Sequence, residues 1–85
     1  MHGDDEVTVD LRFSSSNDEV TELCFEPVGT TFRMNRNDVI YLRIPVSAVP
    51  NLEIIMWQNG IGVWVAPYPG EYIILDGNKV ELDRL

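Results

Sequence analysis

The sequence predicts an all-β protein, a small antiparallel barrel-like sandwich of seven or eight short strands joined mostly as a meander. Apolar and polar residues alternate over most of the chain, which is the pattern of half-buried strands. Turn residues such as Asn-Gly, Asp-Gly and Pro-Gly separate the alternating stretches at short intervals. No window of about eleven residues combines a helical period with a cap and a stop, so no long helix is expected.

Four strands are expected in the first half of the chain, at residues 7–13, 21–25, 30–34 and 40–46. The first of them alternates strictly between apolar and polar residues, which predicts one buried and one solvated face. Pro45 and Pro50 lack a backbone donor, so the fourth strand is expected to end near Ile44 or to lie at a sheet edge there.

The strongest local signal is a hairpin over residues 52–66. Asn59-Gly60 between two apolar runs predicts a two-residue type I′ turn, which places Trp57 opposite Gly62. An aromatic ring that covers a strand glycine stabilises a sheet. One face of the hairpin is then expected to belong to the core, with Leu52, Ile54, Met56, Val63 and Val65. The opposite face is also apolar, so the hairpin needs a second partner.

A last hairpin is expected between residues 72–75 and 80–82. A Gly77-Asn78 loop pairs Leu75 with Val80 and Ile73 with Leu82, which keeps apolar residues opposite one another. An Asp76-Gly77 loop would instead place a glutamate opposite a leucine, so the first register is preferred.

Length and charge restrict the class of protein. The 85 residues fit a single domain, 1–85, in which residues 1–6 are expected to form a mobile terminus. Fourteen acidic against six basic residues give a net charge of −8, which argues against a nucleic-acid binder or a binder of anionic membranes. One cysteine allows no intrachain disulfide and favours a reducing, cytoplasmic location.

The side chains that carry chemistry are scarce, so we expect a protein that is not an enzyme. The only histidine is His2, and acidic neighbours of Cys24 disfavour a reactive thiolate. No catalytic, cofactor-binding or metal-binding residue is predicted. The acidic clusters Asp4–Glu6 and Asp18–Glu26 lack the spacing of a calcium loop and are interpreted as solvated acids. Three arginines, Arg33, Arg36 and Arg43, either pair with acids or form an anion site.

The aromatic and aliphatic residues of the second half suggest an interaction surface. It consists of Ile55, Trp57, Trp64, Tyr68 and Tyr72. These side chains suit a proline-rich or a carbohydrate ligand. The alternative is that the rings complete a small core.

Several short segments resemble a family of small uncharacterised bacterial proteins. They are Glu26-Pro27-Val28-Gly29-Thr30-Thr31-Phe32, Asn37-Asp38, Gly60-Ile61-Gly62-Val63-Trp64 and Asp76-Gly77. The family pattern is E-P-W-G-x-x-[FY], from which this chain departs at Val28 and in the turn at Arg36-Asn37. The resemblance covers residues 22–80 and implies an all-β fold with no assigned activity.

The leading functional hypothesis is a non-enzymatic binding module with a protein partner. Self-association through the 52–66 hairpin is its simplest form, because the second apolar face needs cover. The rival is an acidic inhibitor or immunity-type protein that blocks a basic partner such as a nuclease toxin by electrostatic steering. A small carboxylate enzyme is the weakest interpretation, since so short a chain leaves little room for a substrate cleft.

Overall fold

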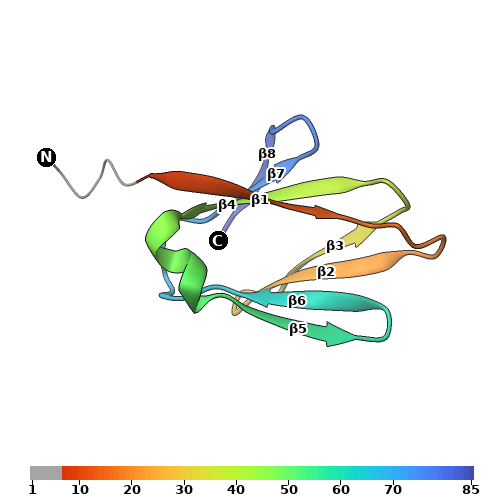
Figure 1. The fold of residues 1–85 in the computed structure, drawn as a ribbon, viewed down its shortest axis with the longest axis horizontal. Helices are drawn as coiled ribbons and strands as arrows, with labels where there is room; N and C mark the ends of the chain where they lie inside the picture. The colour runs from red at the N-terminus through yellow and green to blue at the C-terminus, as the bar shows by residue number, and fades with distance from the viewer. Residues whose placement is uncertain (1–6) are drawn as a thin grey trace, which may run out of the picture.

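A computed structural model describes residues 7–85 as two four-stranded sheets that face each other (Figure 1). Sheet I has the order β1 (Thr8–Ser14), β4 (Val39–Pro45), β7 (Ile73–Asp76) and β8 (Glu81–Arg84). Sheet II has the order β3 (Thr30–Met34), β2 (Thr21–Glu26), β6 (Gly60–Trp64) and β5 (Glu53–Trp57). The 3₁₀ helix η2 (Val46–Asn51) carries the chain from β4 to β5. The expectation of a mobile terminus at residues 1–6 lies outside the described residues, as do His2 and the cluster Asp4–Glu6.

The all-β prediction is confirmed, but three details of its topology are not found. Strands β2 and β6 pair in parallel, so the fold is not wholly antiparallel. Among the six strand pairings of residues 7–85, three join consecutive strands, namely β2–β3, β5–β6 and β7–β8, so the fold is not a simple meander. Within residues 7–85 the two sheets stay separate and neither closes into a barrel. Alternation fixes the face of each residue but not the partner of each strand, which explains these differences.

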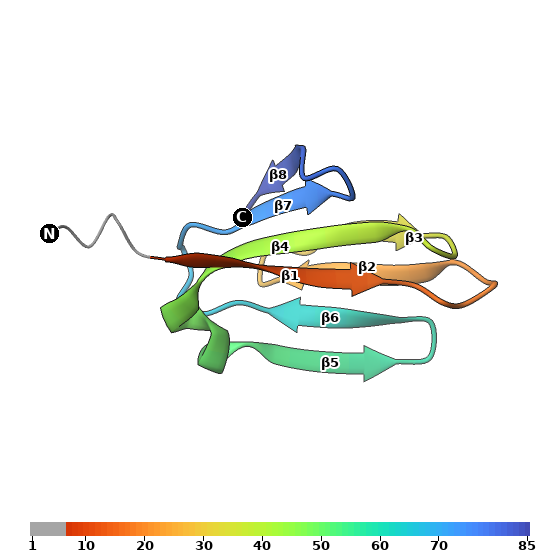
Figure 2. The same ribbon diagram turned by 45° about the horizontal axis from the view of Figure 1, so that its top comes forward.

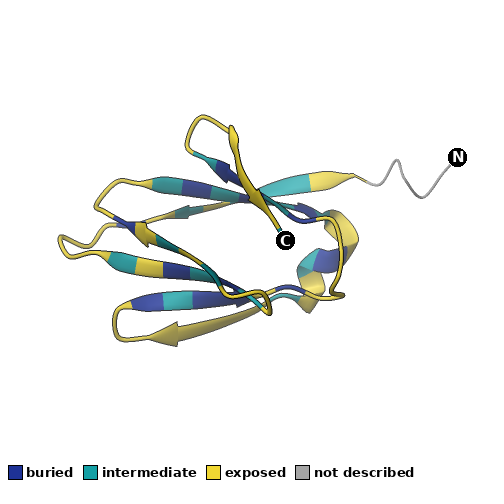
Figure 3. Ribbon diagram, turned by 180° about the vertical axis from the view of Figure 1, so that it is seen from behind, coloured by how far each residue is buried: buried dark blue, intermediate teal, exposed yellow. Residues whose placement is uncertain are grey.

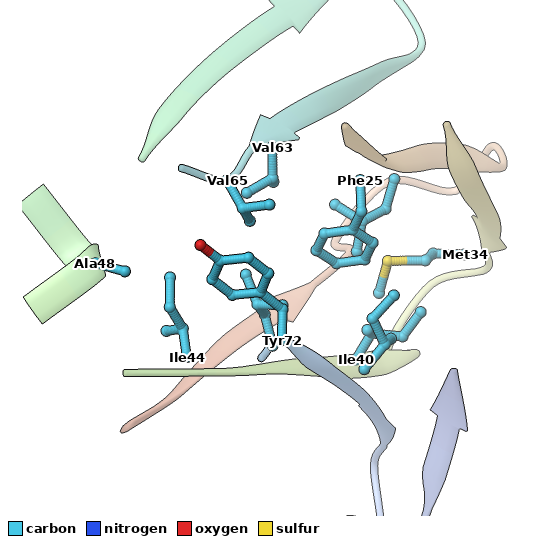
Figure 4. Packing of buried hydrophobic residues seen from close by; sticks show 11 residues of the cluster. Phe25, Met34, Ile40, Ile44, Ala48, Val63, Val65 and Tyr72 are labelled. Atoms are coloured by element: carbon cyan, nitrogen blue, oxygen red, sulfur yellow. The ribbon is translucent and has the colours of Figure 1, made fainter. Parts of the chain in front are cut away.

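The core lies between the two sheets. Strand β4 shows how the alternation builds it, since Ile40, Leu42 and Ile44 are buried between residues that are only partly buried. Phe25 on β2 packs edge-to-face against Phe13 of sheet I, with ring centroids 6.0 Å apart. The buried side chains meet in one cluster (Figure 4), which contains Leu23, Phe25, Met34, Ile40, Leu42, Ile44, Ala48, Val63, Val65, Tyr72 and Ile74.

The β5–β6 hairpin forms, but with a different loop from the expected one. Trp57 pairs with Gly60 and Ile55 with Gly62, so the two-residue loop is Gln58-Asn59. Gly60 lies inside the strand without a positive φ, and the predicted type I′ turn is therefore wrong. A close approach explains this glycine, because a Cβ on Gly60 would stand 2.3 Å from the carbonyl oxygen of Glu22 on β2. The pairing is displaced by two residues, which leaves every side chain on its predicted face.

The predicted core face of this hairpin is buried on β6 but stays exposed on β5. Val63 and Val65 are buried and Leu52 is partly buried, whereas Ile54 and Met56 are 47% and 75% exposed. Strand β5 is the outermost strand of sheet II, and β6 is the one described element that packs extensively against it. The inner face of β5 therefore extends beyond the cover that sheet I supplies.

The last hairpin turns where expected but pairs differently. The amide of Lys79 donates to the carbonyl of Asp76 at 2.8 Å, so Gly77-Asn78 are the central residues of the turn. Lys79 adopts φ 63°, which adds one residue to the loop. Leu75 is consequently opposite Glu81 instead of Val80, and Ile73 is opposite Arg84 instead of Leu82.

Candidate interaction surface

Three large apolar side chains lie together on the outer face of sheet II. Ile55 and Trp57 come from β5, and Trp64 comes from the neighbouring strand β6. Each of the three keeps 40–44% of its surface exposed. The Trp57 ring leans over Gly62, where a Cβ would meet its Cζ3 atom at 3.1 Å. The predicted cover of this glycine by Trp57 is thus present, although the residue directly opposite is Ile55.

Strand β5 is exposed along its whole length (Figure 3). It forms one edge of sheet II, and in Figure 2 no other strand lies beyond it. Both faces of β5 are apolar, since Ile54 and Met56 alternate with Ile55 and Trp57. Exposed apolar surface of this kind on an edge strand is typical of a site of pairing with another chain.

The two tyrosines of the predicted surface differ in exposure. Tyr68 is exposed in the turn after β6, as expected. Tyr72 is only 2% exposed, and its hydroxyl donates a hydrogen bond to the carbonyl of Pro67. Burial raises the pKa of the Tyr72 phenol. Tyr72 therefore belongs to the core and is not available to a partner, because it shares the inward face of Ile74 two residues later.

A cluster of charges on sheet I was not predicted. Arg43 on β4 donates two hydrogen bonds to the carboxylate of Asp10 on β1, at 2.8 and 2.9 Å. Lys79 approaches the same carboxylate at 3.1 Å and lies 4.9 Å from the centre of the Tyr41 ring. The hydrogen bond from Arg43 lowers the pKa of Asp10 to about 2. In the sequence, Asp10 and Arg43 appear only as polar residues at outward-facing positions of two separate strands. The pairing of β1 with β4 brings the two side chains together.

The three arginines do not form an anion site. Arg43 is bound to Asp10 in sheet I, and Arg36 pairs with Asp18 in the turn region. Arg33 lies in sheet II, opposite Glu22 in the β2–β3 register. The pairing with acidic residues, which the sequence left open against an anion site, is therefore found for Arg36 and Arg43. The ion pair of Arg36 with Asp18 also reduces the negative charge that the cluster Asp18–Glu26 presents to a basic partner.

Residues 7–85 contain no group of three or more His, Cys, Asp or Glu side chains placed to hold a metal ion. Cys24 lies partly buried in β2, between Thr31 of β3 and Gly62 of β6.

A hollow of about 370 Å³ opens where β1 leads into β2. Its apolar lining comes from both sheets and includes Phe13, Leu23 and Ile61. Its rim is polar, but Thr21 accepts a hydrogen bond from the Asn17 side-chain amide and shares one with the Ser15 hydroxyl, at 3.0 and 3.3 Å. Three polar groups of the rim therefore bind one another.

No known protein family, curated protein sequence or solved structure matches the chain. The resemblance of residues 22–80 to a small bacterial family therefore stays a prediction. Among residues 7–85 there is also no helix with the length and apolar character needed to cross a membrane.

Proposed function

We propose that this chain is a non-enzymatic binding module whose partner is a protein, in the simplest case a second copy of the chain. The binding surface is the outer face of the β5–β6 hairpin, formed by Ile55, Trp57 and Trp64, with Tyr68 in the following turn. The supporting observation is the exposure of two tryptophans on one face of a hairpin whose other face contributes Val63 to the core. Aromatic side chains of this kind dominate the energetics of protein interfaces.

The charge distribution favours a second copy over a basic partner. Residues 52–66 contain one ionisable side chain, Glu53, so the other residues carry seven of the eight net negative charges. Two copies of an acidic chain repel each other least where neither is charged. A basic partner would find little electrostatic attraction on this hairpin, so the acidic-inhibitor hypothesis requires a different surface.

The proposal includes that the chain is not an enzyme. Asp10 is the carboxylate with a lowered pKa, and two cations hold it in its charged form, so it is unsuited to act as an acid near neutral pH. The proposed location is the cytoplasm, which a chain with a single cysteine suits.

Replacing Trp64 by glutamate tests the proposal. A charge at this position would be buried without a partner in the complex, so Trp64→Glu is expected to fold and to sediment as a monomer. The matched control is Leu82→Glu, which adds the same charge at a similarly exposed residue of sheet I. Sedimentation of wild type and both variants is measured at matched concentrations, with folding checked by circular dichroism.

Wild type and Leu82→Glu should associate, and Trp64→Glu should not. A wild type that remains monomeric at about millimolar concentration would refute self-association. A Trp64→Glu protein that unfolds, while Leu82→Glu stays folded, would show that Trp64 stabilises the monomer and is not an interface residue.

A further inference from the structure

The four edge strands of the two sheets differ in how they are protected from pairing. Charged residues protect β1, with Asp10 and Arg12, and β8, with Glu81, Asp83 and Arg84, and β3 has Arg33 near its end and two threonines at its start. Strand β5 has only Glu53, at its first residue, and contains no lysine, proline or bulge. Natural edge strands avoid association by such devices. The edge of β5 is thus the one least protected against another strand.

The register of the β5–β6 hairpin shows which backbone groups face this edge. Trp57 and Gly60 flank a two-residue loop, and residues in that position exchange both of their hydrogen bonds. The bonding direction alternates along an antiparallel strand, so Ile55 and Glu53 also bond to β6. The N–H and C=O groups of Ile54 and Met56 therefore point away from β6, toward the free edge.

We propose that β5 pairs antiparallel with β5 of a second copy, about a twofold axis at Ile55. Sheet II would then continue through the interface as a single eight-stranded sheet. This inference rests on the self-association in the proposed function, and it places the contact at the edge of β5, beside the outer face that carries Ile55, Trp57 and Trp64. The outward groups of Ile54 and Met56 supply four hydrogen bonds across the axis, two in each of the symmetry-related pairs.

The amino-acid sequence of β5 is complementary to itself in this register. Ile54 is opposite Met56 of the second copy, so the two most exposed side chains of the inner face cover each other. Glu53 is opposite Trp57 of the second copy. The two Glu53 carboxylates are then separated by four residues along the strand, about 14 Å, and their repulsion is small.

The exposed apolar area sets an upper limit on what this dimer can bury. Five side chains leave on the order of 100 Å² each open to water, or about 500 Å² per copy. They are Ile54, Ile55, Met56, Trp57 and Trp64. The total of about 1,000 Å² from both copies is an upper limit, because strand pairing leaves the outer faces of Trp57 and Trp64 partly open to water, and it corresponds to a weak interface. We therefore expect a dissociation constant between about micromolar and about millimolar, which sedimentation can measure.

A disulfide across the axis tests the register. Ile55 faces Ile55 of the second copy in a non-hydrogen-bonded pair, whose Cα atoms lie about 4.5 Å apart, within the range that a disulfide spans. In a Cys24→Ala background, Ile55→Cys is expected to form a covalent dimer when oxidised glutathione is added. Glu53→Cys is the matched control, since its two copies would lie about 14 Å apart and should not cross-link.

The backbone hydrogen bonds are tested by Ile54→Pro against Ile54→Ala. Both variants shorten the side chain, but only proline removes the outward N–H, and it leaves the bonds to β6 intact. Ile54→Pro should weaken dimerisation at least about tenfold more than Ile54→Ala, measured by sedimentation of proteins whose circular dichroism shows them folded.

The outcomes separate this inference from the proposed function. A wild type that dimerises, with no cross-link in Ile55→Cys and equal dimerisation of the two Ile54 variants, overturns the β5 pairing and leaves association through the tryptophan face. Cross-linking of Glu53→Cys instead of Ile55→Cys overturns the register. A wild type that is monomeric at about millimolar concentration overturns self-association itself.

Discussion

The contact between Gly60 and β2 gives the sharpest test of the fold. A Cβ on residue 60 would lie 2.3 Å from the carbonyl oxygen of Glu22, whereas ordinary contact at such a position begins near 3.4 Å. The two strands would have to separate locally by about 1 Å to admit one methyl group. The atom in the way belongs to the backbone of a paired strand, so no side-chain rotation relieves the contact.

The cost follows from what this separation breaks. The amide of Glu22 donates to the carbonyl of Asn59 at 2.8 Å, beside the point of contact. Loss of this bond and one neighbour in the β2–β6 ladder costs about 2 kcal/mol, and disturbed packing of Leu23 adds to it. We expect Gly60→Ala to lower the free energy of unfolding by about 2–4 kcal/mol. A domain of this length has about 4–13 kcal/mol in total.

Gly62→Ala is the matched control, two residues along the same strand and on the same face. Its Cβ would meet the Trp57 ring at 3.1 Å, and this half-exposed side chain can tilt away. The strain is offset by the lower entropy of the unfolded chain, so the net change is expected to stay within about 1 kcal/mol. Gly60→Asn separates close approach from turn chemistry. Asparagine tolerates a positive φ but has a Cβ, so it should cost as much as alanine.

Urea denaturation followed by tryptophan fluorescence measures all three variants, because both tryptophans lie in this hairpin. The reasoning predicts that Gly60→Ala and Gly60→Asn are similar and that both are much less stable than Gly62→Ala. If Gly60→Asn were close to wild type while Gly60→Ala was not, Gly60 would be a turn residue and the β2–β6 pairing would be wrong.

Three further predictions concern single groups. Asp10→Asn should lower stability by about 1–2 kcal/mol at neutral pH, because the carboxylate has a depressed pKa in the folded state. That contribution is complete above the unfolded value of 3.8 and is lost as pH falls to about 2, so urea denaturation should show wild type and variant converging between these values. Tyr72→Phe should lower the free energy of unfolding by about 1 kcal/mol, seen as a fall of about 4–8 °C in Tm, because the carbonyl of Pro67 loses its donor. An excess of EDTA should leave Tm unchanged, since the sequence has few His and Cys ligands, and a fall of about ten degrees would reveal a carboxylate metal site.

The sequence is most informative about which face of a strand each residue occupies. Strict alternation in residues 39–45 correctly places Ile40, Leu42 and Ile44 in the core. Ile55, Trp57 and Trp64 lie on the outward face that the sequence predicts, although the loop differs from the predicted one. A displacement of two residues preserves the face of every side chain. Tyr72 was misplaced since it begins the apolar run 72–75, in which no polar residue marks the outer face.

The partners of the strands could not be predicted, because nothing local records them. Asp10 and Arg43 are 33 positions apart, and each is simply a polar residue in its own alternating strand. Their ion pair exists only because β4 lies beside β1, in a different sheet from β2. The parallel pairing of β2 with β6 likewise depends on η2, which carries the chain to the second sheet before the hairpin returns.

Gly60 connects these two kinds of information. As a residue of an Asn-Gly pair it predicts a turn, yet its real constraint is a backbone oxygen on a strand nearly forty residues earlier. The same tight contact fixes β6 against β2 and so makes β5 the outermost strand of sheet II. The exposed edge of β5 is therefore a consequence of long-range packing. The local sequence pattern shows that the hairpin is apolar on both faces. Only the strand order shows that β5 is also an edge strand, with backbone groups free to pair.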